Sequence, residues 1–198
     1  ADQSMILTPI SLDKLGATLD RFAAQLADPA ACEAFALIRA TSPERAQGVA
    51  AELDRQAALD FARQHGMAAH PLGTACRYNW DGAALDGDTE AYVILHEVAH
   101  FALAPPERRA LPDFGLGPGP DTRDRAGAER AAALSLLERE ADEAMASLLG
   151  ILWEAELGQP ALASFLDQNW LEGLDRSAAA QFRQVLHELI SRDLWSAR

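Results

Sequence analysis

The segment from Ala91 to Leu103 is apolar at almost every position, yet it holds two histidines and a glutamate within five residues. These are His96, Glu97 and His100, in the order HEVAH. A helix that is apolar nearly all round lies buried, and a buried polar group without a partner costs roughly 2–7 kcal/mol. Positions four apart share one helix face, so both imidazoles can bind one ion at about 2.0–2.1 Å. The sequence therefore predicts a buried, metal-binding helix from about Asp88 to Leu103.

The rest of the chain has a helical period, because apolar residues recur at intervals of three and four. We expect helices from Leu12 to Leu26, from Ala31 to Arg39, from a cap at Ser42 to about Gln64, from about Ala128 to Glu156, near Leu162, and from about Ala178 to Trp195. Thr74 to Tyr78 is a candidate strand, and Arg108 to Gly127 is too rich in Gly, Pro and Asp for regular structure. The sequence predicts one mainly α domain over residues 5–198, with at most a short strand or hairpin. Residues 1–4 look like a remnant of cloning.

A third metal ligand is expected from the long helix near the end of the chain. Glu138 and Asp142 are four apart and share an otherwise apolar face with Met145 and Leu149. We predict Glu138 as the ligand and Asp142 as the carboxylate that orients a ligand histidine. Glu140 is the alternative ligand. Glu143 is expected on the outer face of the helix, paired with Arg139.

The chain is strongly acidic, with a formal net charge of −13 at pH 7, and this limits the kinds of partner that are expected. Binding to nucleic acid needs clustered Lys and Arg, so nucleic acid is not expected as a primary ligand. No apolar run is long enough to span a bilayer, so no membrane partner is expected. Cys32 and Cys76 form no disulfide or metal-binding pattern, which is typical of a reducing compartment. We therefore expect a cytoplasmic protein.

The residues alone do not determine which metal ion would bind. Two histidines and a carboxylate suit non-haem Fe(II) with free positions for O₂, and the same set binds Zn²⁺ well. The layout resembles the gluzincin metallopeptidases, and EREADEA is similar to the second-helix motif of several such families. This resemblance implies a zinc peptidase in which Glu97 is the general base and Glu138 binds zinc.

The segment after the histidines resembles another family, the elongation factor P hydroxylases. Seven residues after the HExxH motif these have Arg-Arg-x-Leu-x-Asp-Phe-Gly and, four residues later, Pro-Asp-x-Arg-Asp. This chain has both motifs at matching spacing: Arg108, Arg109, Leu111, Asp113, Phe114, Gly115, Pro120, Asp121, Arg123 and Asp124. The family's aromatic residues after Asp-Phe-Gly are replaced by Leu116, Gly117, Pro118 and Gly119, which allows a different substrate.

This resemblance implies an iron-dependent monooxygenase that uses O₂ and hydroxylates a modified lysine on a translation factor. Its ligand set would be His96, His100 and Glu138, with one or two iron ions. Glu97 would bind a second iron or take a proton. Asp113 would bind a second metal, accept a hydrogen bond from a ligand histidine, or shape a turn. Arg108 and Arg109 would bind a substrate carboxylate or anchor the loop by pairing with Asp121 and Asp124.

Overall fold

The computed structural model describes residues 10–172 and 176–198 and is mainly helical, as predicted. Its α-helices are α1 (Leu12–Ala24), α2 (Pro29–Arg39), α3 (Gly48–Gln64), α4 (Ala91–Leu103), α5 (Pro106–Arg109), α6 (Arg125–Ala131), α7 (Leu136–Glu156), α8 (Ala161–Asp167) and α9 (Arg176–Ser191). A 3₁₀ turn, η1, spans Pro112–Gly115. Two strands, β1 (Ala68–Ala69) and β2 (Ala84–Leu85), form one parallel pair. None of the described helices is both long and apolar enough to cross a membrane.

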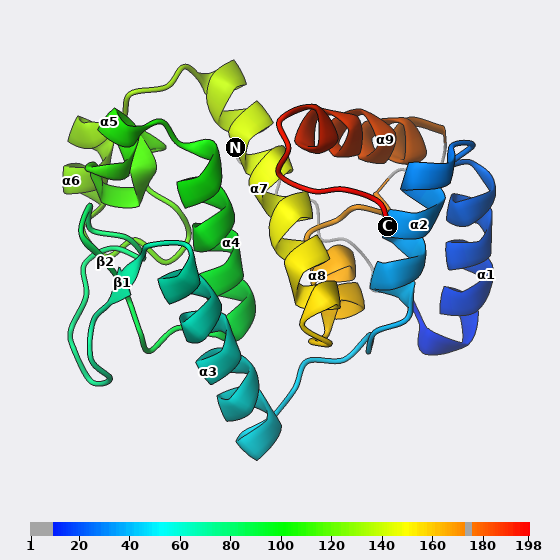
Figure 1. Ribbon diagram of the computed structural model, residues 1–198, viewed down its shortest axis with the longest axis horizontal. Helices are drawn as coiled ribbons and strands as arrows, with labels where there is room; N and C mark the ends of the chain where they lie inside the picture. Colours follow the sequence, from blue (N-terminus) through cyan, green and yellow to red (C-terminus); the bar gives the residue numbers. More distant parts are fainter. Residues whose placement is uncertain (1–9, 173–175) are drawn as a thin grey trace, which may run out of the picture.

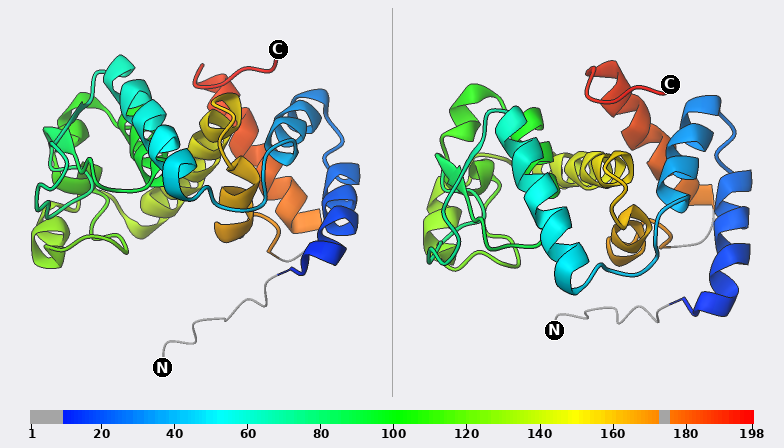
Figure 2. Two further views of the ribbon diagram at one scale, coloured as in Figure 1. Left: turned by 90° about the horizontal axis from the view of Figure 1, so that it is seen from below. Right: turned by 60° about the horizontal axis from the view of Figure 1, so that its bottom comes forward.

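Helix α7 runs through the middle of the molecule, with different elements on its two sides (Figure 1). Helices α4 and α3, both strands and the loop region with α5 and α6 lie on one side. Helices α1, α2, α8 and α9 lie on the other, and the two further views show the same division (Figure 2). The second group is held by four buried phenylalanines, one from each helix, with neighbouring ring centroids 4.8–6.3 Å apart: Phe22, Phe35, Phe165 and Phe182. Helix α7 therefore joins two packed halves.

Several predicted element boundaries are wrong. The helix expected from Ser42 begins at Gly48, because Ser42 instead forms a local turn in which its hydroxyl accepts from the Glu44 amide. The long helix expected over 128–156 is interrupted between α6 and α7. The segment from Thr74 to Tyr78 is not a strand, and the paired strands lie on either side of it. The prediction for residues 1–4 lies outside the described residues.

The region expected to be irregular, residues 108–127, contains η1 and the start of α6 and is tightly held. Trp80 supports it: its carbonyl accepts from the Asp113 amide at 2.8 Å, and its indole N–H donates to the Arg109 carbonyl at 2.7 Å. Gly82, at φ 96°, lets the backbone pass so close that a Cβ there would lie 2.5 Å from the Ala110 oxygen. Residues 80–82 thus fix the loop that follows α4.

Helices α4 and α7 cross closely at the motif. A Cβ at Gly150 of α7 would lie 3.3 Å from both the Cα and the N of His96. This contact would be tighter than most contacts of a Cβ atom, so the glycine favours the close approach of α7 to α4. The crossing brings the acidic first half of α7 beside the histidines of α4.

Candidate metal centre

The two histidines lie one turn apart on the same face of α4. Their Nε2 atoms are 3.0 Å apart, and the rings are nearly perpendicular at 88°. The helix is anchored by Ile94, Leu95, Val98 and Ala99, none of which is exposed. The predicted buried helix is therefore present, and its packing holds both imidazoles in place.

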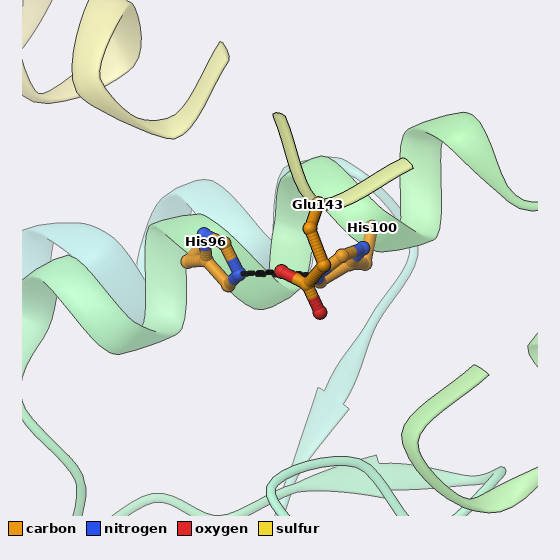
Figure 3. A group of neighbouring side chains, drawn as sticks. All are labelled: His96, His100 and Glu143. Atoms are coloured by element: carbon orange, nitrogen blue, oxygen red, sulfur yellow. Dashed lines mark hydrogen bonds and ion pairs between the residues drawn. The ribbon is translucent and has the colours of Figure 1, made fainter. Parts of the chain in front are cut away.

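Glu143 of α7 completes a three-membered group with these histidines (Figure 3). Its Oε2 lies 3.2 Å from His96 Nε2 and 3.3 Å from His100 Nε2. Three donor atoms that are each about 2.1 Å from one ion stand about 3.0 Å apart at octahedral angles and about 3.4 Å apart at tetrahedral angles. The observed spacings of 3.0–3.3 Å fall in this interval. The triangle therefore has the right size for a single divalent ion.

Asp142 orients His100, the contact that the sequence predicted. Its Oδ1 lies 2.7 Å from His100 Nδ1, and both side chains are buried. A carboxylate can only accept, so Nδ1 carries the hydrogen, and in the neutral ring the lone pair is on Nε2. That lone pair points into the triangle, as expected of a metal-binding histidine.

Glu138 lies elsewhere, which corrects the predicted ligand set. Its carboxylate accepts from the amide and the hydroxyl of Ser135, both at 2.8 Å, in a capping box at the start of α7. The stretch Ser-Leu-Leu-Glu is a sequence signal for this role, and it also marks where α7 begins. Five residues separate Glu138 from Glu143, so the two point about 140° apart around the helix.

The other acidic and basic side chains of α7 also differ from expectation. Glu140, the alternative ligand, is exposed and lies outside the group formed by the histidines and Glu143. Arg139 does not pair with Glu143, because its guanidinium lies against Gly117 in the loop after η1. Residue spacing alone placed Glu143 on the outer face, but it stands at the edge of the buried face and reaches across to α4.

Glu97, between the two histidines in sequence, is 7% exposed and lines the cavity beside them. Among the described residues it has no hydrogen-bond or ion-pair partner. Burial raises its pKa to about 8; His100 opposes this shift, while the carboxylates of Asp113 and Glu143 add to it. Without a bound metal ion the carboxyl group is therefore protonated at neutral pH, and it lies in the cavity where it could exchange a proton.

The two imidazoles differ in their affinity for protons. Burial and the neighbouring His100 lower the pKa of His96, although Glu143 opposes the shift. Burial also disfavours the charged form of His100, but the carboxylates of Asp142 and Glu143 outweigh it and raise the pKa to about 10. Without a bound metal the proton of this group therefore resides on His100, and a metal ion that binds there would have to displace it.

The loop after α4 forms one wall of the cavity, whose volume is about 690 Å³. Asp113, Asp121 and Thr122 line this wall. Asp113 is buried and accepts from the Thr122 hydroxyl at 2.8 Å and from the Trp80 amide at 3.4 Å. Of the three roles predicted for Asp113, these contacts match that of a residue that shapes the loop.

The predicted pairing of the loop arginines with Asp121 and Asp124 does not occur. Arg109 donates to the carbonyls of Phe101 and Ala104. Asp124 caps α6 by accepting from the Gly127 amide and also accepts from the Tyr78 hydroxyl. The pairing was expected from charge alone, whereas the short α5 directs both arginines back toward α4 and α7.

The remaining loop residues are placed as follows. Arg108 donates to Asp142 and to the Phe114 carbonyl. Asp121 and Arg123 are exposed, and the Arg123 amide donates to the Arg77 carbonyl. Ser147, Gln168 and Trp170 also line the cavity, and the sequence did not single out the first two. They lie at the middle of α7 and after α8, and nothing in their spacing connects them to the histidine motif.

Comparison with known proteins gives no family model, no curated protein and no solved structure that matches this chain.

Proposed function

We propose that this chain is a metal-dependent hydroxylase related to the elongation factor P hydroxylases, with iron bound by His96, His100 and Glu143. The observation that carries the proposal is the position of the loop. The residues that resemble that family, among them Asp113 and Asp121, line the same cavity as the three ligand side chains. The position of this loop beside the ligand side chains supports a role in substrate binding or in the reaction.

The ligand geometry supports a reactive ion rather than a closed structural one. The three side chains come from two helices that meet on one side of the triangle, and all three line the cavity. A two-histidine, one-carboxylate set leaves coordination positions open, and bound Fe(II) would there supply the activation of O₂. Glu97 would hold or release a proton next to the reacting group.

The charge of the cavity supports a cationic substrate. Its described lining includes no Lys or Arg, and it holds the acidic side chains of Asp113, Asp121, Glu143 and Glu172 besides the protonated Glu97. A site lined by one sign of charge concentrates ligands of the other sign. A modified lysine on a protein such as a translation factor has this chemistry. The small residues Gly117 and Gly119 also leave more room than aromatic side chains would.

A zinc peptidase is the second candidate, and Glu97 is the observation that favours it. A carboxyl group beside the ligands can serve as the general base for hydrolysis once a bound cation lowers its pKa and it loses its proton. Peptidases of this kind usually bind an extended substrate along a strand edge. In the described part of the chain the strands have two residues each, and neither lines the cavity. This favours the hydroxylase.

Metal analysis of protein purified without oxygen from cells grown on iron-57, combined with Mössbauer spectra, tests the proposal. One or two irons per chain would support the hydroxylase, together with a gain of one oxygen atom on a lysine-bearing translation factor that needs both O₂ and an added two-electron reductant. Zinc alone, with peptide cleavage that is lost in Glu97→Gln, would support the peptidase instead.

A further inference from the structure

We propose that Arg108 is a positioning residue for His100, acting on the imidazole from two sides through Asp142 and Phe114. The inference rests on the proposed metal binding by His100 and deepens it. It connects the loop that borders the cavity to the orientation of one metal ligand.

The first connection is a buried chain of hydrogen bonds. Arg108 Nη2 donates to Asp142 Oδ2 at 3.0 Å, and Asp142 Oδ1 accepts from His100 Nδ1 at 2.7 Å. The side chains of Arg108, Asp142 and His100 are only 12%, 9% and 3% exposed. Each oxygen of the carboxylate thus has a different partner, so the guanidinium fixes the plane in which Asp142 meets the imidazole.

The second connection runs through the loop. Arg108 Nη1 donates to the Phe114 carbonyl at 3.2 Å, and the Phe114 ring lies against the His100 ring with centroids 5.8 Å apart. Phe114 also stacks on Trp80, nearly parallel at 3°. The backbone of Phe114 is in the left-handed region, at φ 57°, which is unfavourable for a large side chain and must be held by its surroundings. Arg108 supplies one of these restraints.

Only a forked donor can make both connections at once. A guanidinium presents several N–H groups in a fixed plane, whereas the ammonium of a lysine is a single point charge. One nitrogen of Arg108 reaches the carboxylate, and the other reaches the loop carbonyl. Loss of the fork would free both Asp142 and Phe114 to move, and the His100 ring with them.

The expected loss of metal affinity on replacing Arg108 can be taken from other metal sites. Removal of a group that hydrogen-bonds a ligand typically lowers metal affinity by about 10–100-fold. We expect a loss in this range for Arg108→Met. Arg109→Met is the matched control, because Arg109 is adjacent in the loop but donates to the Phe101 and Ala104 carbonyls. It is expected to leave metal affinity within about twofold of the wild type.

The experiment measures Co²⁺ affinity and the visible Co²⁺ spectrum for the wild-type protein, both arginine variants, Asp142→Ala, and the double variant Arg108→Met/Asp142→Ala. If Arg108 acts partly through Asp142, its substitution costs clearly less in the Asp142→Ala background than in the wild type. The spectrum of Arg108→Met should also change, because the coordination geometry changes. A residue that only stabilises the fold would lower the unfolding temperature without altering the spectrum.

Arg108→Lys keeps the positive charge and the aliphatic part of the side chain but removes the guanidinium. If Arg108→Met does not fold, this variant tests whether the guanidinium positions His100. It is expected to bind Co²⁺ more weakly than the wild type, with a shifted spectrum. Three outcomes would each overturn this inference while leaving the proposed function in place. They are wild-type Co²⁺ affinity in the folded Arg108 variants, an equal loss of affinity in Arg109→Met, and fully additive losses of affinity in the double variant Arg108→Met/Asp142→Ala. Absence of Co²⁺ binding by the wild-type protein would overturn the proposed function together with it.

Discussion

His100 is the residue on which most contacts of the candidate centre converge. It meets Asp142 through Nδ1, and His96 and Glu143 through Nε2. In the metal-free protein the carboxylates keep a proton on this ring, although burial opposes it. His100 thus acts as a base that two carboxylates strengthen, and protons would compete with a metal ion for it.

Metal binding should therefore release protons. With a pKa of about 10, His100 holds an extra proton at pH 7, and an ion at Nε2 must displace it. We expect at least about one proton released per Zn²⁺ at pH 7, and an affinity that rises with pH until about pH 10. His96 should contribute none, because its pKa is lowered. Titration with Zn²⁺ in a weakly buffered indicator solution measures the release. An affinity that does not depend on pH between about 6 and 9 would contradict this account.

The glutamate that joins the two histidines shows where sequence reasoning succeeds and fails for single residues. The histidines and Asp142 were identified because apolar surroundings and a four-residue spacing fix which face a side chain occupies. Glu138 shares that spacing, but its partner is local, because Ser135 engages it in a capping box. Glu143 lies at the edge of the face, where only the angle at which α7 crosses α4 decides what it meets.

Helices α4 and α7 form the pair that builds the site, and their elements were largely predictable. The apolar period identified both, while the break before α7 was missed because Ser135 and Glu138 were not taken as a helix start. Their close crossing could not be predicted from a period. It depends on Gly150, which lies against the backbone of His96.

Substitution of Gly150 tests this crossing. An alanine there gains about 1 kcal/mol of helix propensity, but overpacking against backbone costs about 1–3 kcal/mol. We expect Gly150→Ala to lower the free energy of unfolding in urea and to weaken metal binding, because α4 must move at His96.

Gly16 provides the matched control, since it lies inside α1 with no atom within 4 Å of a Cβ built there. Gly16→Ala should raise stability by about 0.5–1 kcal/mol. An equal gain in Gly150→Ala, with unchanged metal affinity, would show that the crossing is not tight.

The molecule as a whole depends on α7, whose second half is buried between the two groups of helices. Its fold class was predictable from the apolar period, but the arrangement around α7 was not, because helix order does not determine which faces meet. Glu154 illustrates this. It is a charged residue in the sequence, yet it is 2% exposed and accepts from the Ser164 hydroxyl of α8 at 2.7 Å.

Glu154 should make the stability of the protein depend on pH. Burial raises its pKa from 4.5 to about 8, although Ser164 and Arg45 oppose the shift. Between these values the folded state holds a proton that the unfolded chain releases, so stability falls as pH rises through this window. Glu154→Gln resembles the protonated form, and it should be more stable than the wild type at about pH 9 by at least about 1 kcal/mol, but not at pH 4. Urea unfolding at both pH values measures this, and equal differences at the two would contradict it.

The stoichiometry of Co²⁺ binding in two glutamate variants tests whether α4 and α7 form one metal site. The wild-type protein should bind one ion per chain through His96, His100 and Glu143. Removal of a group that hydrogen-bonds a metal ligand lowers metal affinity by up to about 100-fold. Glu143→Gln changes a ligand itself, so we expect a larger loss of affinity. Glu138→Gln should bind like the wild type and lose only some thermal stability, since its carboxylate caps α7. Loss of binding in Glu138→Gln with full binding in Glu143→Gln would contradict the site described here.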